Sequence, residues 1–413
     1  MTEIDNALRS LKEGHWFKLI CGASYQHLPA VRNLTLAYTL AGADCIDVAA
    51  DPAVIASAQM AIGVASTLME EARRRGFGSR EKLPWLMVSL NDGEDPHFRK
   101  AEFNVAECPS ECDRPCERVC PAQAIVFHRP SDNYSGVLSE SCYGCGRCLP
   151  ICPPQIIYTR AYVSTPGAIA PLVLTTGVDA VEIHTQVGRI SEFQRLWLSI
   201  SPWLDRLKLV AISCPDDNGL VEYLQSLYRL ISPLKCPLIW QTDGRPMSGD
   251  IGDGTTLAAV KLGQKVLAAD LPGYVQLAGG TNSYTVAKLQ AMGMLRSSQK
   301  LKVKSQKIGD RRQETGDRSN FSPSDPPAFF PDSCKGGFRN PPLPTHHSHI
   351  SGVAYGSYAR VLLSPVLHQL EQMEVNRDNE RAIARLEDVP ELLWQAVELA
   401  YSLVSQLKSM ELP

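Results

Sequence analysis

The spacing of cysteines between residues 108 and 152 constrains this chain more than any other feature of its sequence. The later run reads C-x2-C-x2-C-x3-C-P and consists of Cys142, Cys145, Cys148 and Cys152, followed by Pro153. The earlier run reads C-x3-C-x3-C-x3-C-P and consists of Cys108, Cys112, Cys116 and Cys120, followed by Pro121. The later spacing is that of bacterial ferredoxins with two [4Fe–4S] clusters, in which the fourth cysteine of a run ligates the other cluster.

Crossed ligation divides the eight thiolates into two sets. The first cluster would be held by Cys108, Cys112, Cys116 and Cys152. The second cluster would be held by Cys142, Cys145, Cys148 and Cys120. The earlier run is looser than the standard spacing, which is compatible with a labile cluster or one of altered reduction potential. Two all-cysteine zinc sites are the alternative, but zinc ribbons use two separated C-x2-C knuckles and neither run has that form.

The rest of the composition indicates a cytoplasmic redox protein. The N-terminal residues are polar and acidic, and no uninterrupted apolar stretch of about 18 residues is present, so we expect neither a secretory signal nor an integral membrane segment. Clustered cysteines in a reducing compartment bind metal more often than they form disulfides. The net charge of -3 gives no argument for nucleic acid, and the basic run 300–312 is interpreted as part of a solubilising linker.

Apolar strand-like runs alternate with helix-like periodicity on both sides of the cysteine region. Three such runs precede it, four follow it, and one lies near the C-terminus: residues 17–21, 45–48, 84–90, 179–184, 207–213, 237–242, 273–278 and the start of 352–363. Eight βα units predict an α/β fold, a (β/α)8 TIM-like barrel with a two-cluster ferredoxin-like α+β domain inserted after the third strand. An open doubly wound sheet is the alternative.

The predicted organisation has five parts. Residues 1–101 and 159–295 form the two parts of the barrel, and 102–158 form the insert. Residues 296–345 are a linker of low complexity, expected to be disordered because it cannot bury apolar surface. Residues 346–413 supply the last βα unit and a C-terminal amphipathic helix.

The barrel itself carries weaker signals. Gly279 and Gly280 follow the seventh strand, and Gly356 and Arg360 lie at the eighth, where barrels often bind phosphate groups. These residues predict an anchor for a sugar phosphate or for FMN, with ordinary glycine turns as the alternative. Polar residues at strand ends are candidates for a barrel active site, or simple solvated and capping residues: Asp47, Asp51, Glu182, His184, Asp243 and Arg245.

Two further groups of residues are interpreted without a function. A histidine-rich stretch is expected to be an ordinary loop rather than a metal site: His346, His347 and His349. The cysteines in or beside predicted strands are expected to act as small buried hydrophobes: Cys21, Cys45, Cys214 and Cys236. Cys334 lies in the linker, where an exposed thiol is the alternative, and nothing near it indicates a reactive one.

Three segments that flank the cysteine runs add specificity. Residues 20–24 (ICGAS), 42–47 (GADCID) and 276–282 (QLAGGTN), together with the runs, resemble the cyanobacterial light-dependent period (LdpA) family. The resemblance extends over most of the chain, and 296–345 is the part least like it. It implies an iron–sulfur protein of the circadian-clock input pathway, associated with clock input and output proteins. It carries the cluster role onto the eight cysteines and assigns no catalytic residue.

Three hypotheses follow from these observations. The first is a redox-sensing regulatory protein without enzymatic activity, whose clusters report the state of a quinone, ferredoxin or nicotinamide pool. The second is an oxidoreductase with a flavin on the barrel, fed by the clusters. The third is an electron carrier within a larger redox complex.

Overall fold

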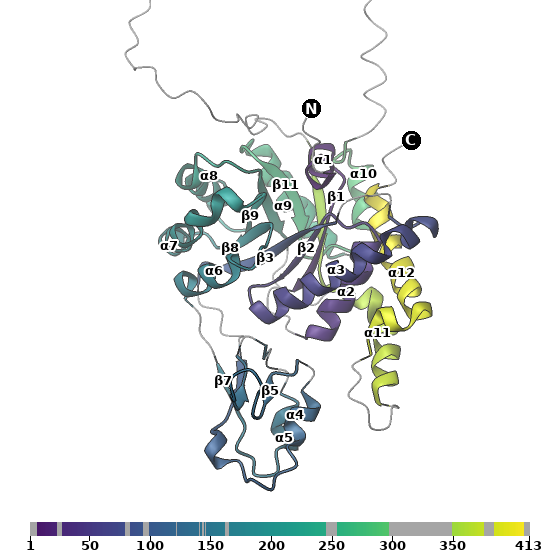
Figure 1. Ribbon diagram of the computed structural model, residues 1–413. Helices are drawn as coiled ribbons and strands as arrows, with labels where there is room; N and C mark the ends of the chain where they lie inside the picture. Colours follow the sequence, from purple (N-terminus) through teal and green to yellow (C-terminus); the bar gives the residue numbers. More distant parts are fainter. Residues whose placement is uncertain are drawn as a thin grey trace, which may run out of the picture.

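The computed structural model describes residues 6–22, 27–78, 83–93, 99–120, 122–139, 141–142, 144, 146–161, 165–244, 254–296, 349–375 and 384–408. Eight parallel strands close into a barrel (Figure 1), in the order β1-β2-β3-β8-β9-β10-β11-β12. The strands are β1 (Trp16–Gly22), β2 (Cys45–Ala49), β3 (Trp85–Asn91), β8 (Ala180–His184), β9 (Leu209–Pro215), β10 (Leu238–Asp243), β11 (Tyr274–Ala278) and β12 (Gly352–Tyr355). The predicted barrel is confirmed, and the doubly wound alternative is wrong because β12 pairs with β1.

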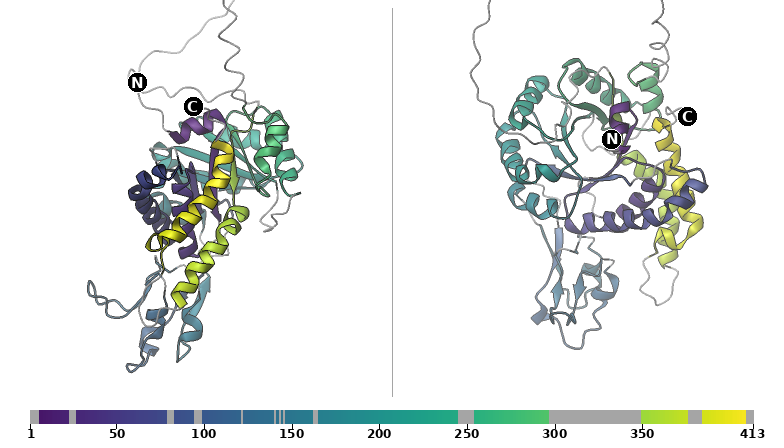
Figure 2. Two further views of the ribbon diagram at one scale, coloured as in Figure 1. Left: turned by 90° about the vertical axis from the view of Figure 1, so that its right-hand side faces the viewer. Right: turned by 45° about the horizontal axis from the view of Figure 1, so that its top comes forward.

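Helices follow the strands and cover the barrel from outside. They are α2 (Leu28–Leu40), α3 (Pro52–Arg74), α6 (Pro166–Leu174), α7 (Ile190–Ile200), α8 (Leu220–Ile231), α9 (Thr256–Ala268), α10 (Thr285–Ala291) and α11 (Ser357–Val375). Two 3-10 turns, η2 (Ser201–Arg206) and η4 (Leu386–Asp388), complete this layer. A C-terminal helix, α12 (Pro390–Lys408), packs along α2 and α11 (Figure 2).

Helix α3 is, within the described ranges, the one helix with the length and apolar composition of a membrane span. Its sequence alternates Ala, Val and Ile with polar residues, and it packs along α2 and β2. A buried core helix passes the same compositional test, so the expectation of no membrane segment stays a prediction.

A short first helix, α1 (Asn6–Glu13), lies at the end of the barrel where the strands begin. Its Ala7 and Leu11 join an apolar cluster with the indole rings of Trp16 and Trp85, which meet edge to face at 5.7 Å. This cluster fills the inside of the barrel at that end, and the polar residues described below lie further along the strands, toward the opposite end.

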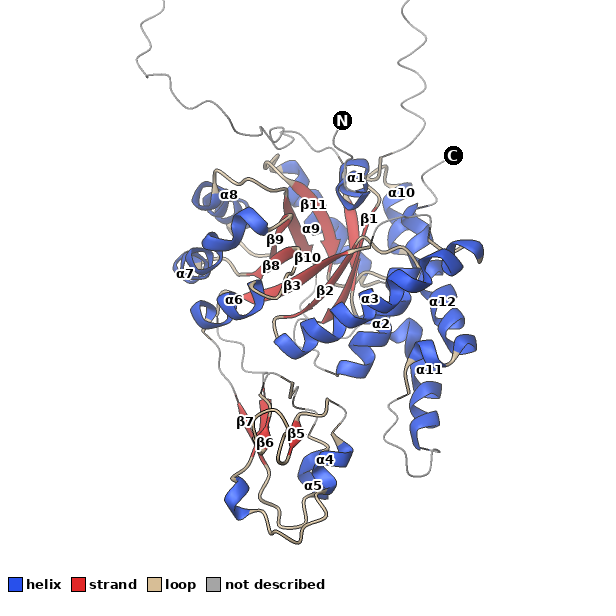
Figure 3. Ribbon diagram, viewed as in Figure 1, coloured by secondary structure: helices blue, strands red, loops and turns tan. Residues whose placement is uncertain are grey.

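The insert leaves the barrel after β3 and returns before β8, and these two strands pair directly. Its ends are the antiparallel strands β4 (Arg99–Glu102) and β7 (Tyr158–Ala161); a second pair is formed by β5 (Ile125–Val126) and β6 (Gly136–Val137). Three short helical turns complete it: η1 (Val105–Glu107), α4 (Pro115–Val119) and α5 (Cys148–Ile151). Figure 3 shows this unit projecting from the barrel end opposite α1.

The insert has a small core of its own. Phe103, Ala124, Ile125 and Ile157 are buried together with several of the cysteines. The strand pair β4–β7 extends past the predicted boundaries at 102 and 158 on both sides. The predicted linker, apart from its first residue, lies outside the described residues.

Candidate cluster sites and the barrel interior

The first set of cysteines meets beside helices α4 and α5. Cys116 and Cys152 are 5% and 6% exposed, whereas Cys108 and Cys112 are partly exposed. Burial raises the pKa of the Cys116 thiol to about 11, and the nearby thiols of Cys152, Cys108 and Cys112 add to this shift. The structure therefore brings the last cysteine of the later run to three cysteines of the earlier run, which is the arrangement that crossed ligation requires.

The second set lines an apolar pocket beside β4. Cys120, Cys142 and Cys148 face this pocket together with Ala101 and Ala124. The backbone N–H of Ala124 donates to Cys120 Sγ at 3.2 Å, and that of Ala101 donates to Cys142 Sγ at 3.3 Å. Hydrogen bonds of this kind stabilise thiolates and set cluster potentials. Cys145, the fourth predicted ligand, lies outside the described residues.

The loop around the second set depends on two glycines. Gly144 and Gly146 have φ of 74° and 73°, in the left-handed region that disfavours residues with a Cβ. Both also line the pocket, where a bare backbone can approach a bound group closely. The backbone conformation of the later C-x2-C-x2-C run thus explains why glycine stands at these two positions.

The donor set fits an iron–sulfur group. Within the described ranges, no three His, Cys, Asp or Glu side chains converge as ligands of a single metal ion. Each thiolate of a cubane binds a different iron, so its four ligands need not converge on one point. All-thiolate donors, an apolar lining and N–H groups directed at sulfur together match that kind of cofactor.

The second candidate site is a network of polar side chains inside the barrel. The sequence did not predict that these side chains contact one another. Lys18 of β1 is fully buried, and its Nζ lies 3.2 Å from Asp47 Oδ2 and also donates to Glu182. Burial lowers the pKa of Lys18, but the two carboxylates outweigh it and hold this pKa well above its usual range. Burial also raises the pKa of Asp47 to about 6, although Lys18 partly opposes that shift.

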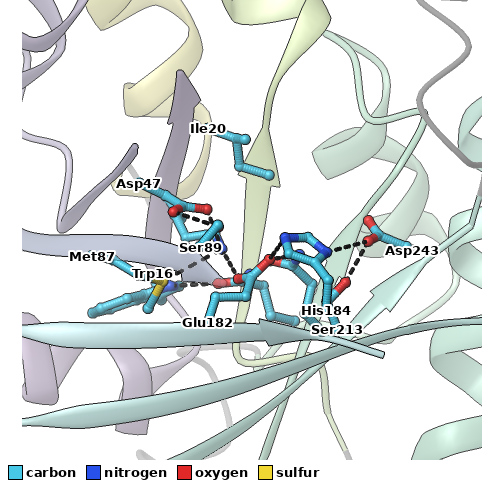
Figure 4. A network of polar contacts seen from close by, with 12 residues as sticks. Trp16, Ile20, Asp47, Met87, Ser89, Glu182, His184, Ser213 and Asp243 are labelled. Carbon is cyan, nitrogen blue, oxygen red and sulfur yellow. Dashed lines mark hydrogen bonds and ion pairs between the residues drawn. The ribbon is translucent and has the colours of Figure 1, made fainter. Parts of the chain in front are cut away.

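Hydrogen bonds continue this network across the barrel (Figure 4). Gln241 Nε2 donates to Glu182 Oε1 at 2.5 Å, and Gln276 Nε2 donates to Gln241 Oε1 at 2.6 Å. Trp16 Nε1 then donates to Gln276 Oε1 at 2.6 Å. Barrel interiors are usually filled by branched aliphatic side chains. An extended charged and amide layer is therefore unusual, and it connects strands β1, β8, β10 and β11.

The mouth of the barrel lies at the open end of this network. His184 Nε2 is 3.2 Å from Glu182 Oε1, and its Nδ1 is 4.0 Å from Asp243 Oδ2. Ser213 also donates to Asp243. The side chains of His184 and Asp243 are 27% and 23% exposed, so a molecule at the mouth would reach both.

The structure sorts the predicted strand-end residues into two groups. Asp47, Glu182, His184 and Asp243 meet in the network, as an active-site arrangement would require. Asp51 does not join them, because it caps helix α3 and pairs with Lys100 of the insert. Arg245 lies outside the described residues.

The residues predicted to bind a phosphate group lie in tight turns or make contacts that join barrel elements. Gly280 has φ of 95°, and a Cβ there would come within 2.7 Å of the carbonyl oxygen of Thr255. Arg360 donates to the carbonyl oxygen of Ile20 at 3.2 Å and to Ser357 Oγ at 3.0 Å, which ties α11 to β1. Gly279, also in the left-handed region, and Gly356 belong to the same turns. The FMN anchor stays a prediction, since these contacts equally serve to close the barrel.

The remaining histidines and cysteines are placed as follows. His349 lies just before β12, whereas His346, His347 and Cys334 lie outside the described residues. The other four cysteines outside the two runs are buried: Cys21, Cys45, Cys214 and Cys236.

Comparisons with known proteins agree with this arrangement. The model of the light dependent period A C-terminal domain matches residues 172–406. The chain belongs to the light dependent period A family. The model of this family's Fe-S cluster-binding domain matches residues 108–163, so the insert is an iron–sulfur cluster-binding domain and the zinc alternative is not favoured.

One curated relative matches over much of its length. Light dependent period A of Synechococcus elongatus is 52% identical over 288 residues, which cover 70% of this chain and 77% of the relative. Among solved structures, (S)-3-O-geranylgeranylglyceryl phosphate synthase from Thermoplasma acidophilum, in complex with sn-glycerol-1-phosphate, aligns with a TM-score of 0.34 and 9% identity, covering 99% of each chain. At that score the alignment carries no argument, and the barrel is established by its own strand pairing.

Proposed function

We propose that this chain is a cytoplasmic redox-sensing regulatory protein, which relays the light-dependent redox state of the cell to the circadian clock. The observation that supports the proposal is the grouping of the described cysteines inside the insert: Cys152 lies near Cys108, Cys112 and Cys116, and Cys120 lines a pocket with Cys142 and Cys148. The name of the Synechococcus elongatus relative supports the link with light and period. Clock input and output proteins are the proposed partners, with a larger redox complex as the alternative.

Two [4Fe–4S] clusters are the proposed cofactors. Cys108, Cys112, Cys116 and Cys152 would hold the first. Cys120, Cys142, Cys145 and Cys148 would hold the second. When bound, each cluster supplies reversible one-electron chemistry, with a potential set by hydrogen bonds, charge and exposure.

Each set holds two buried cysteines, but the first set has two partly exposed members, whereas Cys120 is the one partly exposed member among the described residues of the second set. Cys108 and Cys112 are partly exposed, and Glu107, Glu111 and Asp113 around them are exposed. Cys142 and Cys148 are 9% and 6% exposed and face an apolar pocket. We assign electron exchange with external carriers to the cluster of the first set, because electron transfer requires close approach of the carrier. We assign communication with the barrel to the cluster of the second set.

A redox-poised EPR titration of anaerobically purified protein tests the proposal, with iron and sulfide counted on the same sample. Two reducible cubane signals and about eight irons per chain are expected from the two-cluster pattern. Zinc in place of iron, or no reducible signal in intact anaerobic protein, would overturn it. To separate a sensor from a simple carrier, partners are captured with oxidised and with reduced protein; only a sensor changes its partner affinity with redox state.

A second candidate function rests on the network at the barrel mouth. A buried lysine between two carboxylates, with His184 and Asp243 open to solvent beside them, is an arrangement that binds or converts a polar small molecule. An iron–sulfur oxidoreductase with a flavin on the barrel would use it. Release of FMN on denaturing the purified protein supports this function, and a barrel free of any bound organic molecule refutes the flavin form.

A further inference from the structure

An ion pair joins the insert to the barrel. Lys100 Nζ of β4 lies 3.4 Å from Oδ2 of Asp51, which stands two residues after the end of β2. Their side chains are 13% and 3% exposed, so solvent screens this pair far less than a surface pair. Of the described residues, these are the two of opposite charge that bridge the two units within 4 Å.

On the insert side, Lys100 is adjacent to the second set of cysteines. Its Nζ also donates to the carbonyl oxygen of Ser139, in the turn that leads to Cys142. The next residue, Ala101, donates its backbone N–H to Cys142 Sγ and lines the pocket. The ammonium group of Lys100 is thus held three residues before Cys142, and the residue after Lys100 bonds to the sulfur of this predicted cluster ligand.

On the barrel side, Asp51 controls the start of a helix. Its Oδ1 accepts a hydrogen bond from the backbone N–H of Ala53 at 2.8 Å and caps the N-terminus of α3. Such a cap stabilises the first turn of a helix. One carboxylate therefore serves two purposes, since one oxygen caps α3 and the other holds Lys100.

A second element of the insert approaches the same end of the barrel. Arg147, between Cys145 and Cys148 in the later run, lies near His27, the N-cap residue of α2. Burial lowers the pKa of His27, and the positive charge of Arg147 lowers it further. Lys100 and Arg147, which approach the starts of α3 and α2, are thus both next in sequence to residues that line the pocket of the second set.

We propose that the Lys100–Asp51 ion pair is a redox-sensitive joint, through which the charge of the second cluster controls the start of helix α3. The inference rests on the proposed function, because it requires a cluster held by Cys120, Cys142, Cys145 and Cys148. One electron added there, from the reductant that the cluster equilibrates with, places negative charge beside Lys100 and competes with Asp51 for its ammonium group. Reduction then weakens the ion pair and loosens the capped end of α3.

The coupling must work in both directions. If reduction weakens the ion pair, the ion pair must oppose reduction by the same free energy. Asp51 therefore lowers the midpoint potential of the second cluster, and Lys100 raises it. The potential of the first cluster, whose ligands do not adjoin Lys100, should not respond.

Hydrogen exchange measured by mass spectrometry on the full chain tests the joint, comparing protein oxidised in air-free buffer with protein reduced by dithionite. The reporter is the peptide over residues 52–60, and the variants are Lys100→Gln and Asp51→Asn. Asparagine caps helices as well as aspartate does, so the second variant removes the charge and keeps the cap. Arg160→Gln is the matched control, because Arg160 is the cross-strand partner of Lys100 and, among the residues that the structure describes, forms an ion pair with Glu102 inside the insert.

We expect faster exchange at the start of α3 on reduction in the wild type and in Arg160→Gln, and loss of this difference in both other variants. EPR titration should show a raised midpoint for the second cluster in Asp51→Asn and a lowered one in Lys100→Gln. A reduced second cluster without any change in α3, or a difference that Arg160→Gln also abolishes, overturns the joint and leaves the proposed function standing. Absence of any reducible cluster overturns both.

Discussion

Replacing Lys18 by methionine removes the one cation of the buried network in the barrel. Methionine fills a similar volume, so the change in packing is small. What remains is a pair of carboxylates, Asp47 and Glu182, that are 1% and 0% exposed and have lost their common partner. Removing one partner of a buried ion pair costs roughly 3–5 kcal/mol, because it leaves an uncompensated buried charge. We expect a loss of that size in Lys18→Met at neutral pH.

The pH dependence has a definite sign. In the wild type the pKa of folded Asp47 is raised to about 6 from 3.8, so the folded state binds this proton more tightly than the unfolded state. That contribution stabilises the fold as pH falls through 6 toward 4 and is lost as pH rises. Lys18 partly opposes the rise in the pKa of Asp47, so Asp47 is harder to ionise without it, and the stability of the variant must rise more steeply on acidification than that of the wild type.

The assay is urea unfolding followed by tryptophan fluorescence, since Trp16 and Trp240 lie in the barrel strands. It is run at pH 8 and pH 5.5 on the wild type, on Lys18→Met and on Lys18→Met combined with Glu182→Gln. The double variant should recover part of the loss, because it removes one unpaired carboxylate. A cost below about 1 kcal/mol for Lys18→Met at pH 8, where a buried ion-pair partner should be worth several, would refute this account of the network. So would a cost that does not shrink at pH 5.5.

Three other predictions are independent of that network. Cys152→Ser should abolish the same EPR signal as Cys116→Ser, although the two residues belong to different runs; loss of the other signal would refute crossed ligation. Gly280→Ala should destabilise the barrel by about 2 kcal/mol in thermal unfolding, since its φ of 95° and the nearby carbonyl of Thr255 disfavour a Cβ; an unchanged melting temperature would contradict this. Iodoacetamide at pH 8 should leave four buried thiols of the native barrel unmodified, because burial raises their pKa, to about 12 for three of them; rapid labelling would show that they are accessible. These thiols are Cys21, Cys45, Cys214 and Cys236.

The barrel was predictable because its strands are locally recognisable. Strands of a parallel barrel are buried on both faces, so each gives a short, predominantly apolar run, as at 45–48 and 273–278. These runs agree with β2 and β11 to within one residue. The grouping of the cysteines was also expected from their sequence spacing, because the spacing in a cluster loop is dictated by the geometry of the cofactor.

The polar network was not predicted, although each strand contained a sign of it. Lys18 interrupts an apolar strand, and Gln241 and Gln276 do the same in β10 and β11. Which of these side chains meet depends on strand register across a closed barrel, and no local pattern fixes that register. Asp51 shows the opposite error, because a residue proposed for an active site proved to lie outside the network. Its position near a strand end suggested that role, but its contacts are with the neighbouring helix and with the insert.

The pairing of β1 with β12 has a consequence for the protein's synthesis. The cysteine-bearing insert ends at β7, whereas the barrel cannot close until Gly352–Tyr355 have left the ribosome. At the usual 5–20 residues per second, translating the chain between these two points takes on the order of 10–40 s. During that interval the insert can fold on its own strand pairs while the barrel beside it is still an open, incomplete sheet. The thiols of the insert are therefore synthesised and accessible to the cell's cluster-assembly machinery before the barrel is complete.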